Sequence, residues 1–397
     1  MAPESKPTSV WITGTGAVSS AGEDVAHTRD AFFHARREPA PKPPFESPVS
    51  CPTFQVAAPL PVLEGRRNHS RSLRLAMRAA QEALAEAGLG AFPPDARVGV
   101  CLGTTVASQL NAVPFYDAYR RHADPAMDPV LNFLSANLSE AVGDLVGAIG
   151  PRLTVVNACS SGTDAIGIAS DWIRAGLCDV ALAGGADELH RVPLAGFWSL
   201  GVMSAEPCAP FDRDRSGLNL GEGAGIVVLE SQAHAAGRGQ ALEFEVAGFG
   251  AACDAHHLTA PHPDGRGLER AIHVALAEAG ITPSQIAFIN AHGTATQDND
   301  RTEAGVIARL FGAQIPFLST KGYTGHTLGA AGGLEAVFTV MGLRDGWIPA
   351  SAGFIHQAND LPIAPTRHRT PIAGQYAMST SLAFGGNNAA LVIRRVT

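Results

Sequence analysis

Residues 154–167 of this 397-residue chain read Thr154-Val155-Val156-Asn157-Ala158-Cys159-Ser160-Ser161-Gly162-Thr163-Asp164-Ala165-Ile166-Gly167. A short β-branched run ends abruptly there, and a helix of small, glycine-spaced residues begins at Cys159. A thiolate at such a strand-to-helix turn faces unpaired backbone N–H groups and the positive end of a helix dipole, which lower its pKa. We therefore expect Cys159 to be a nucleophile. The alternative for a lone cysteine is a buried structural role.

The length and composition are those of a large globular protein. With 46% hydrophobic and 17% charged residues, the chain can bury a large core, as two or three domains or as one duplicated unit. The net charge of −8 argues against a general nucleic-acid binder. Six scattered cysteines without a C-x-x-C pair fit neither a disulfide scaffold nor a zinc site.

The N-terminus gives no sign of export or membrane insertion. Residues 1–7 lack a hydrophobic signal core, and no apolar run in the chain is long enough to span a bilayer. We therefore expect a soluble cytoplasmic protein without a membrane partner.

Strand and helix patterns alternate along the chain, which favours a sheet covered on both faces. We expect a first strand over 9–13, a glycine turn at 14–16 and a surface loop over 37–62. The pattern then predicts a helix over 70–87, a strand over 97–102, a helix over 131–149, and strands over 179–183 and 225–230. The segment 155–159 resembles 317–321, since each precedes a Gly/Ala-rich helix. This internal echo indicates a duplication that joins near 232–243.

Two other motifs invite a functional interpretation that their context does not support. The Gly14-x-Gly16 turn lacks the third glycine and the acidic ribose partner of a dinucleotide site. His256, His257 and His262 lack a defined ligand frame, so we assign no metal to them.

Three segments carry groups for chemistry. They are Asn-Ala-Cys159-Ser-Ser-Gly, Asn-Ala-His292-Gly-Thr-Ala-Thr and Thr-Lys321-Gly-Tyr-Thr-Gly-His326-Thr-Leu-Gly-Ala-Ala-Gly. A single histidine after a strand is more often a structural residue, and Lys321 alone is compatible with a surface loop. Cysteine, two histidines and lysine in three such loops are harder to attribute to packing.

Together these segments resemble the β-ketoacyl-acyl-carrier-protein synthases, the decarboxylating condensing enzymes of the thiolase superfamily. The resemblance extends over nearly the whole chain, through residues 10–19, 210–217, 221–225 and 384–388. It implies an α/β, thiolase-like duplicated fold of five α-β-α-β-α layers. Residues 1–238 would form the half with the nucleophile, and residues 239–397 the half with the two histidines.

The resemblance also implies roles for the reactive residues. Cys159 takes an acyl group from a carrier-protein thioester, and its N–H and that of Phe384 form an oxyanion hole. His292 and His326 stabilise the enolate that malonyl-carrier protein forms on losing CO₂. Lys321 supports His326 and the local field. Glu335 joins a buried polar network, unless it is an ordinary solvated helix residue.

Further residues concern the substrate and its carrier. By resemblance, Thr294 and Thr296 hold the amides of phosphopantetheine, and Thr259 belongs to the same channel. The resemblance implies no bound cofactor or metal, since the enzyme acts on phosphopantetheine thioesters of acyl carrier protein. A group of arginines either docks this acidic carrier or forms a merely solvated face: Arg66, Arg67, Arg71, Arg74 and Arg78.

The chain departs from the family at the motif usually read Gly-Phe-Gly-Gly-Thr-Asn. Here Ala383 replaces the first glycine, which restricts the backbone of the Phe384 loop, and Asn387 replaces the threonine. The departure concerns chain-length range rather than the condensation.

Two alternatives to a catalytic elongating synthase remain. A non-catalytic chain-length partner of a ketosynthase heterodimer would lack the active cysteine. A thiolase-like or hydrolytic acyltransferase acting on coenzyme A esters would carry a second catalytic cysteine. The superfamily pairs its subunits, so we expect a homodimer or a heterodimer with a ketosynthase-like partner.

Overall fold

The computed structural model describes residues 8–396 except 64–69, 91, 93–95 and 136. The elements of the first half are β1 (Val10–Ser19), α1 (Val25–Phe33), α2 (Arg71–Glu86), β2 (Val98–Gly103), η1 (Ala107–Ala112), α3 (Val113–Arg120), α4 (Asp128–Ser135), α5 (Leu138–Val146), β3 (Arg152–Val155), η2 (Ala158–Ser160), α6 (Ser161–Arg174), β4 (Val180–Asp187), α7 (Arg191–Ser199), β5 (Gly223–Ser231) and α8 (Gln232–Gly237). Those of the second half are β6 (Phe244–Cys253), α9 (Arg266–Ala279), η3 (Pro283–Gln285), β7 (Ile286–Asn290), α10 (Gln297–Phe311), β8 (Phe317–Leu318), α11 (Lys321–Thr324), η4 (Leu328–Ala330), α12 (Ala331–Asp345), β9 (Trp347–Ile348), β10 (Thr370–Pro371), β11 (Tyr376–Leu382) and β12 (Asn387–Arg395).

The ten-stranded sheet shows the internal duplication. Its order is β3-β2-β4-β5-β1 followed by β6-β12-β11-β7-β8. In each half three parallel strands lie outermost, and the two strands nearest the centre pair antiparallel. The halves join where Trp11 and Ile12 of β1 pair with Glu245 and Phe244 of β6. The boundary expected at 238/239 stays a prediction, whereas the duplicated α/β architecture is confirmed by this strand order.

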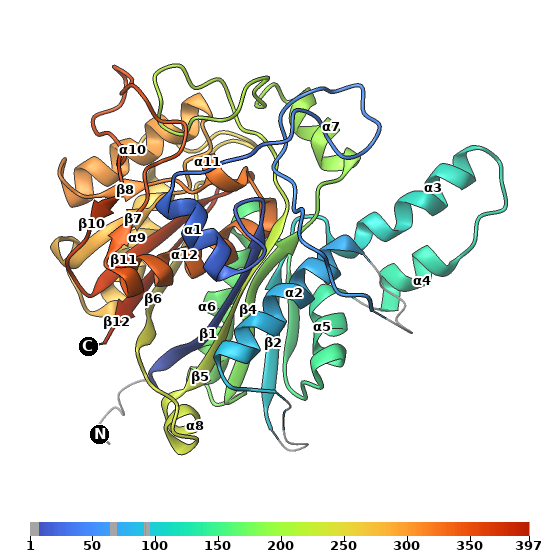
Figure 1. Cartoon of the computed structure of the whole chain (residues 1–397), viewed down its shortest axis with the longest axis horizontal. Coiled ribbons are helices and arrows are strands. Elements are labelled where there is room, and N and C mark those ends of the chain that lie inside the picture. The colour runs from blue at the N-terminus through green and yellow to red at the C-terminus, as the bar shows by residue number, and fades with distance from the viewer. Residues whose placement is uncertain (1–7, 64–69, 91, 93–95, 136, 397) are drawn as a thin grey trace.

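The helices supply the remaining layers of the five-layered fold (Figure 1). On one outer face α2 packs on β1 and β5, and on the other α9 packs on β6 and β12. Between the sheet halves, α6 and α12 contact each other and strands of both halves. Small residues permit this approach: a Cβ on Gly162 of α6 would lie 2.7 Å from the backbone nitrogen of Gly333 in α12. The start of α6 is therefore buried in the middle of the molecule.

The expected turn at residues 14–16 is wrong, because β1 continues through both glycines to Ser19. A Cβ on Gly16 would lie 2.0 Å from the carbonyl oxygen of Ala79 in α2. The second half of the chain has the equivalent contact. There, a Cβ on Gly250 of β6 would lie 2.1 Å from the carbonyl oxygen of Ala271 in α9. Gly16 and Gly250 each let an outer helix lie directly on the strand, so they serve packing.

Three further expectations concern the segments 70–87, 131–149 and 37–62. The helix expected over 70–87 is confirmed as α2, whose Ser70 cap accepts a hydrogen bond from the Leu73 N–H. The single helix expected over 131–149 is wrong: α4 ends at Ser135, and Asn137 caps a separate α5. The segment 37–62 is not all surface, since the side chain of Phe54 is fully buried.

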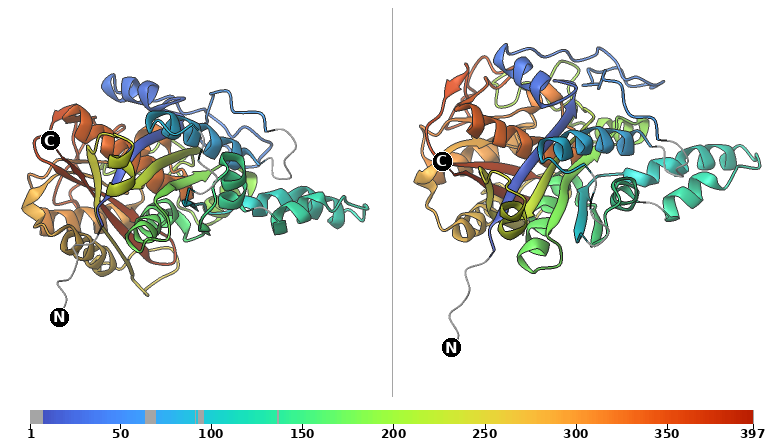
Figure 2. Two further views of the ribbon diagram at one scale, coloured as in Figure 1. Left: turned by 90° about the horizontal axis from the view of Figure 1, so that it is seen from below. Right: turned by 60° about the horizontal axis from the view of Figure 1, so that its bottom comes forward.

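One feature projects from this compact body. Helices α3 and α4 form an arm that extends away from the sheet, as Figure 2 shows in two views. Among the described residues, no helix is both long enough and apolar enough to cross a membrane.

Candidate active site

The nucleophile turn joins β3 to α6. Ala158, the first residue of η2, has φ +50°, a conformation that redirects the chain between strand and helix. The Ser161 hydroxyl fixes the turn by accepting from the Asn157 N–H at 2.7 Å and donating to the Ala158 oxygen at 2.6 Å. Cys159 is only 4% exposed there. The strand-to-helix setting expected for this cysteine is confirmed.

The low pKa expected for the Cys159 thiol is wrong. Burial raises the pKa of Cys159 to about 11, because a buried thiolate loses its solvation. The Lys321 charge and the backbone N–H of Phe384, which donates to the sulfur, lower the pKa by less. Cys159 is therefore a protonated thiol at neutral pH in the free protein.

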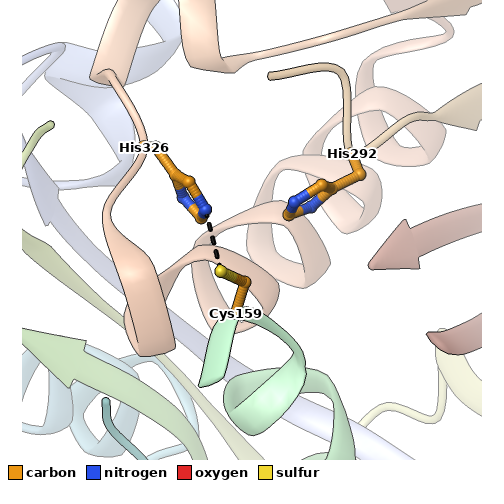
Figure 3. A group of neighbouring side chains, drawn as sticks. All are labelled: Cys159, His292 and His326. Atoms are coloured by element: carbon orange, nitrogen blue, oxygen red, sulfur yellow. Dashed lines mark hydrogen bonds between the residues drawn. The ribbon is translucent and has the colours of Figure 1, made fainter. Parts of the chain in front are cut away.

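Two histidines lie beside this thiol (Figure 3). Nε2 of His326 is 3.0 Å from Sγ of Cys159, and the rings of His292 and His326 lie 5.2 Å apart at 86°. The Leu328 N–H donates to Nδ1 of His326, and Nζ of Lys321 lies 3.1 Å from Nδ1 of His292. Since each Nδ1 accepts a hydrogen bond, each Nε2 carries the proton. Burial, and then the Lys321 charge, hold both histidine pKa values well below the usual range, so both rings are neutral donors.

Lys321 contacts His292 directly, whereas it acts on His326, which it was expected to support, through its charge. Its ammonium also donates to the His292 carbonyl at 2.6 Å and forms an ion pair with Glu335. Both partners of this pair are 2% exposed. Burial raises the pKa of Glu335 to about 7, although the adjacent Lys321 lowers it. Glu335 is thus part of a buried polar network, not a solvated helix residue.

A cleft of about 250 Å³ opens onto these groups. Cys159, His292 and His326 line it together with Thr259, Thr294 and Thr296, the three expected pantetheine contacts. Phe384 also lines it, and its ring stacks on Phe197 of α7 at 5.3 Å.

Comparison with known proteins identifies the family of this site. Residues 58–235 match the family model described as beta-ketoacyl synthase, N-terminal domain, and residues 244–355 match the C-terminal domain model. The chain belongs to the β-ketoacyl synthase family. It is 34% identical to 3-oxoacyl-(acyl-carrier-protein) synthase 2 of Staphylococcus aureus, over 97% of this chain and 98% of that protein.

Solved structures agree with this assignment. A β-ketoacyl synthase from Burkholderia phymatum is 32% identical, with a TM-score of 0.91 over 98% of this chain and 100% of that one. A ketosynthase from Xenorhabdus doucetiae, solved with its chain length factor, is 30% identical, with a TM-score of 0.84 over the full length of both. The chain is a condensing enzyme of this family and not a non-catalytic chain-length partner.

The structure adds supporting residues of the ketosynthase site that sequence reasoning missed. Glu303 of α10 accepts the backbone N–H groups of His292 and Gly293, both at 2.8 Å, and the hydroxyl of Thr380. Asp187, at the end of β4, accepts the N–H of Gly329 at 2.7 Å. Nothing in the sequence distinguishes these buried acids from exposed ones such as Asp298, which lies on the same helix as Glu303.

The arginines expected to dock a carrier protein have other contacts where the structure describes them. Arg71 forms a bidentate pair with the buried Glu222, and Arg74 donates to the carbonyls of Leu60 and Pro61. Arg66 and Arg67 lie outside the described residues. Carrier docking by this group stays a prediction.

Two groups of described residues bring metal-type ligand atoms within 4.8 Å of one another. One is Cys159 with His292 and His326, and the other is Glu23, Asp24 and His27 at the surface. The first group is the ketosynthase reaction centre itself. The expectation of no resident metal or cofactor stays a prediction. His257 instead accepts two backbone N–H groups at a turn, from Thr259 and Ala260.

Proposed function

We propose that this ketosynthase transfers an acyl group from acyl carrier protein to Cys159 and condenses it with malonyl-carrier protein. The products are CO₂, free carrier thiol and a β-ketoacyl-carrier protein. The observation that supports this most strongly is one cleft in which a thiol and two neutral Nε2–H donors face the same space. The thiol carries the acyl group, which is the electrophile. The two donors stabilise the enolate, which is the nucleophile.

The first half-reaction acylates Cys159. The sulfur attacks the thioester carbonyl as its proton leaves, and the carrier thiol departs with a proton. The backbone N–H of Phe384 already points at the sulfur, and with the N–H of Cys159 it stabilises the oxyanion of the tetrahedral intermediate. Nε2–H of His326, 3.0 Å from Sγ, donates to the sulfur and stabilises it while the thiol proton passes to the departing carrier thiol.

The second half-reaction makes the carbon nucleophile. The Nε2–H groups of His292 and His326 donate to the malonyl thioester carbonyl, and CO₂ leaves as negative charge develops on that oxygen. The resulting enolate carbon attacks the acyl carbonyl on Cys159, and the sulfur leaves. Lys321 keeps Nδ1 of His292 occupied as an acceptor, so its proton stays on the nitrogen that faces the cleft. Buried donors stabilise this charge more strongly than exposed ones, because no water reorganises.

The cleft residues suit the carrier arm. Thr294 and Thr296 lie with their hydroxyl oxygens 2.8 Å apart, and Thr259 lines the same cleft. Hydroxyls both donate and accept, which suits the amides of a phosphopantetheine arm. We propose that acyl carrier protein delivers both thioesters through this opening.

A second ketosynthase-like subunit is the other partner that we propose. Strand β3 lies at the edge of the sheet, with Leu153 and Val156 exposed beside it. Tyr119 and Leu134 on the α3–α4 arm are 65% and 72% exposed. An open sheet edge next to exposed apolar side chains favours a subunit that extends the sheet and receives the arm. The relative from X. doucetiae is paired with its chain length factor.

Light scattering tests the subunit proposal. We expect twice the 41.1 kDa mass of one chain, or a complex with a coexpressed ketosynthase-like chain. Leu134→Glu should weaken the pairing, whereas Val274→Glu on α9 should not. A stable monomer that binds no such chain would overturn the proposal.

Product analysis tests the reaction. With acyl- and malonyl-carrier protein, we expect a β-ketoacyl-carrier protein two carbons longer and one CO₂ per turnover. Condensation of acetyl-coenzyme A without malonyl-carrier protein would instead indicate a thiolase, and release of free acid would indicate a hydrolase.

A further inference from the structure

The loop that carries Phe384 is tied to the nucleophile turn by a pair of side-chain amides. Nδ2 of Asn387 donates to Oδ1 of Asn157 at 2.5 Å, across 230 positions of sequence. Asn157 lies two residues before Cys159, and Asn387 lies three residues after Phe384. The pair therefore links the two backbone segments that carry the N–H donors proposed for the oxyanion.

The orientation of the Asn157 amide is fixed from its other side. Its Nδ2 donates to Oδ2 of Asp164 at 2.6 Å, and the Ser160 hydroxyl donates to the same oxygen at 2.8 Å. Asp164 is 6% exposed on α6. Because the nitrogen of the Asn157 amide faces this carboxylate, its oxygen must face Asn387 and requires a donor there. Asn387 supplies that donor.

The far side of the Phe384 loop is held through its own backbone groups, two of which also accept side-chain hydrogen bonds: Gly386 O from Asn388 Nδ2 at 2.9 Å and Gly385 O from the Cys253 thiol at 3.7 Å. The Gly385 N–H donates to the Leu258 oxygen at 2.8 Å, and the Gly386 oxygen accepts from the Asp254 N–H at 2.8 Å. Gly385 and Gly386 have φ of +87° and +84°, so the tip has little side-chain restraint of its own. The amide pair is a side-chain anchor that ends on the nucleophile turn, beside the Phe384 backbone N–H that donates to the Cys159 sulfur.

We infer that Asn387 is a positioning residue that sets the separation between the Cys159 and Phe384 N–H donors through Asn157. The inference rests on the proposed ketosynthase reaction. It assigns Asn387 to steps that form a tetrahedral centre at Cys159, namely acylation and condensation. Malonyl decarboxylation depends on His292 and His326, so it does not need the amide pair.

The test compares two rates in the full-length protein. Asn387→Asp keeps the shape but places a carboxylate oxygen against the Asn157 oxygen. We expect acylation of Cys159 by acyl-carrier protein to fall about 10- to 100-fold, the range for misplaced catalytic groups. Malonyl decarboxylation should stay within about twofold of wild type, since its donors are untouched. Asn387→Thr retains a shorter donor and should lie closer to wild type. Asn359→Asp, at an exposed position, makes the same chemical change as a control.

A double-mutant cycle tests the pairing itself. If Asn157 and Asn387 act together, Asn157→Ala with Asn387→Ala should acylate no more slowly than the slower single variant. Additive slowing, unchanged acylation in Asn387→Asp and Asn387→Thr, or a parallel fall of both rates would overturn the inference. If Asn387→Asp does not fold, the inference is tested by the acylation rate of Asn387→Thr against wild type and by the double-mutant cycle. Failure of the wild-type protein to acylate would instead contradict the proposed function.

Discussion

Nε2 of His326 lies 3.0 Å from Sγ of Cys159, although 167 positions separate the two residues. This contact joins the two halves of the duplicated fold, because Cys159 lies in the turn just before the central helix α6 of one half and His326 precedes the central helix α12 of the other. Helices α6 and α12 pack against each other through glycines, which brings the loops before them together. The thiol and the two histidines thus owe their proximity to the packing of the central layer.

His326→Ala should lower malonyl decarboxylation by at least about 100-fold, the usual loss when one donor to a developing oxyanion is removed. Acyl transfer to Cys159 should be partly retained, because its oxyanion is served by backbone N–H groups. Release of labelled CO₂ and protein mass spectrometry measure the two steps. His273→Ala, on the surface of α9, is the control. Unchanged decarboxylation in His326→Ala would refute the enolate role.

Alkylation of Cys159 should report its raised pKa. With a pKa of about 11, the rate of reaction with iodoacetamide should rise about tenfold per pH unit from pH 7 to pH 10. Lys321→Met should slow it at every pH, because the Lys321 charge lowers this pKa. Peptide mapping separates Cys159 from the exposed Cys253. A plateau below pH 8 would show that Cys159 is a thiolate in the free enzyme.

Asp187 should make the folded state less stable as the pH rises. Burial raises its pKa from 3.8 to about 6, so the native state binds this proton more tightly than the unfolded state does. Its contribution is greatest below pH 3.8 and is lost by about pH 6, a change of about 3 kcal/mol. The free energy of unfolding of wild type minus that of Asp187→Asn should therefore fall over this window. Urea titrations at several pH values measure it, and a constant difference would contradict the buried-charge account.

Gly16→Ala should lower the free energy of unfolding by about 1–3 kcal/mol, the usual cost of overpacking. The new methyl group would meet the Ala79 carbonyl of α2. Gly90→Ala is the matched control, because no atom lies within 4 Å of its added Cβ. Equal stability of the two variants would mean that α2 does not lie on β1 as described.

Local sequence signals were sufficient for the reactive residues. Cys159 lies at a β-branched run followed by small residues, and His292 and His326 lie in comparable loops. The sequence motifs and the expected place of these residues at strand ends therefore indicated the same site. The helix expected over 70–87, observed as α2 at Arg71–Glu86, likewise follows from its own periodicity. These features depend on neighbours in the chain.

Features that depend on distant neighbours were missed or wrong. The pKa of Cys159 is set by burial under the second half, which no local pattern reports. Gly14 and Gly16 appeared to form a turn because their partner is the backbone of α2, far along the chain. Glu303 and Asp187 were not singled out, since burial of a charge is decided by which N–H groups the fold places around it.

Intact-mass spectrometry of the protein during one turnover tests the central claim most directly. Incubation with acyl-carrier protein should add one acyl mass at Cys159. Malonyl-carrier protein should then remove that mass as β-ketoacyl-carrier protein appears. Cys253→Ala should behave as wild type, and Cys159→Ala should neither gain the mass nor elongate the chain. Elongation by Cys159→Ala, or a productive adduct on another residue, would contradict the account.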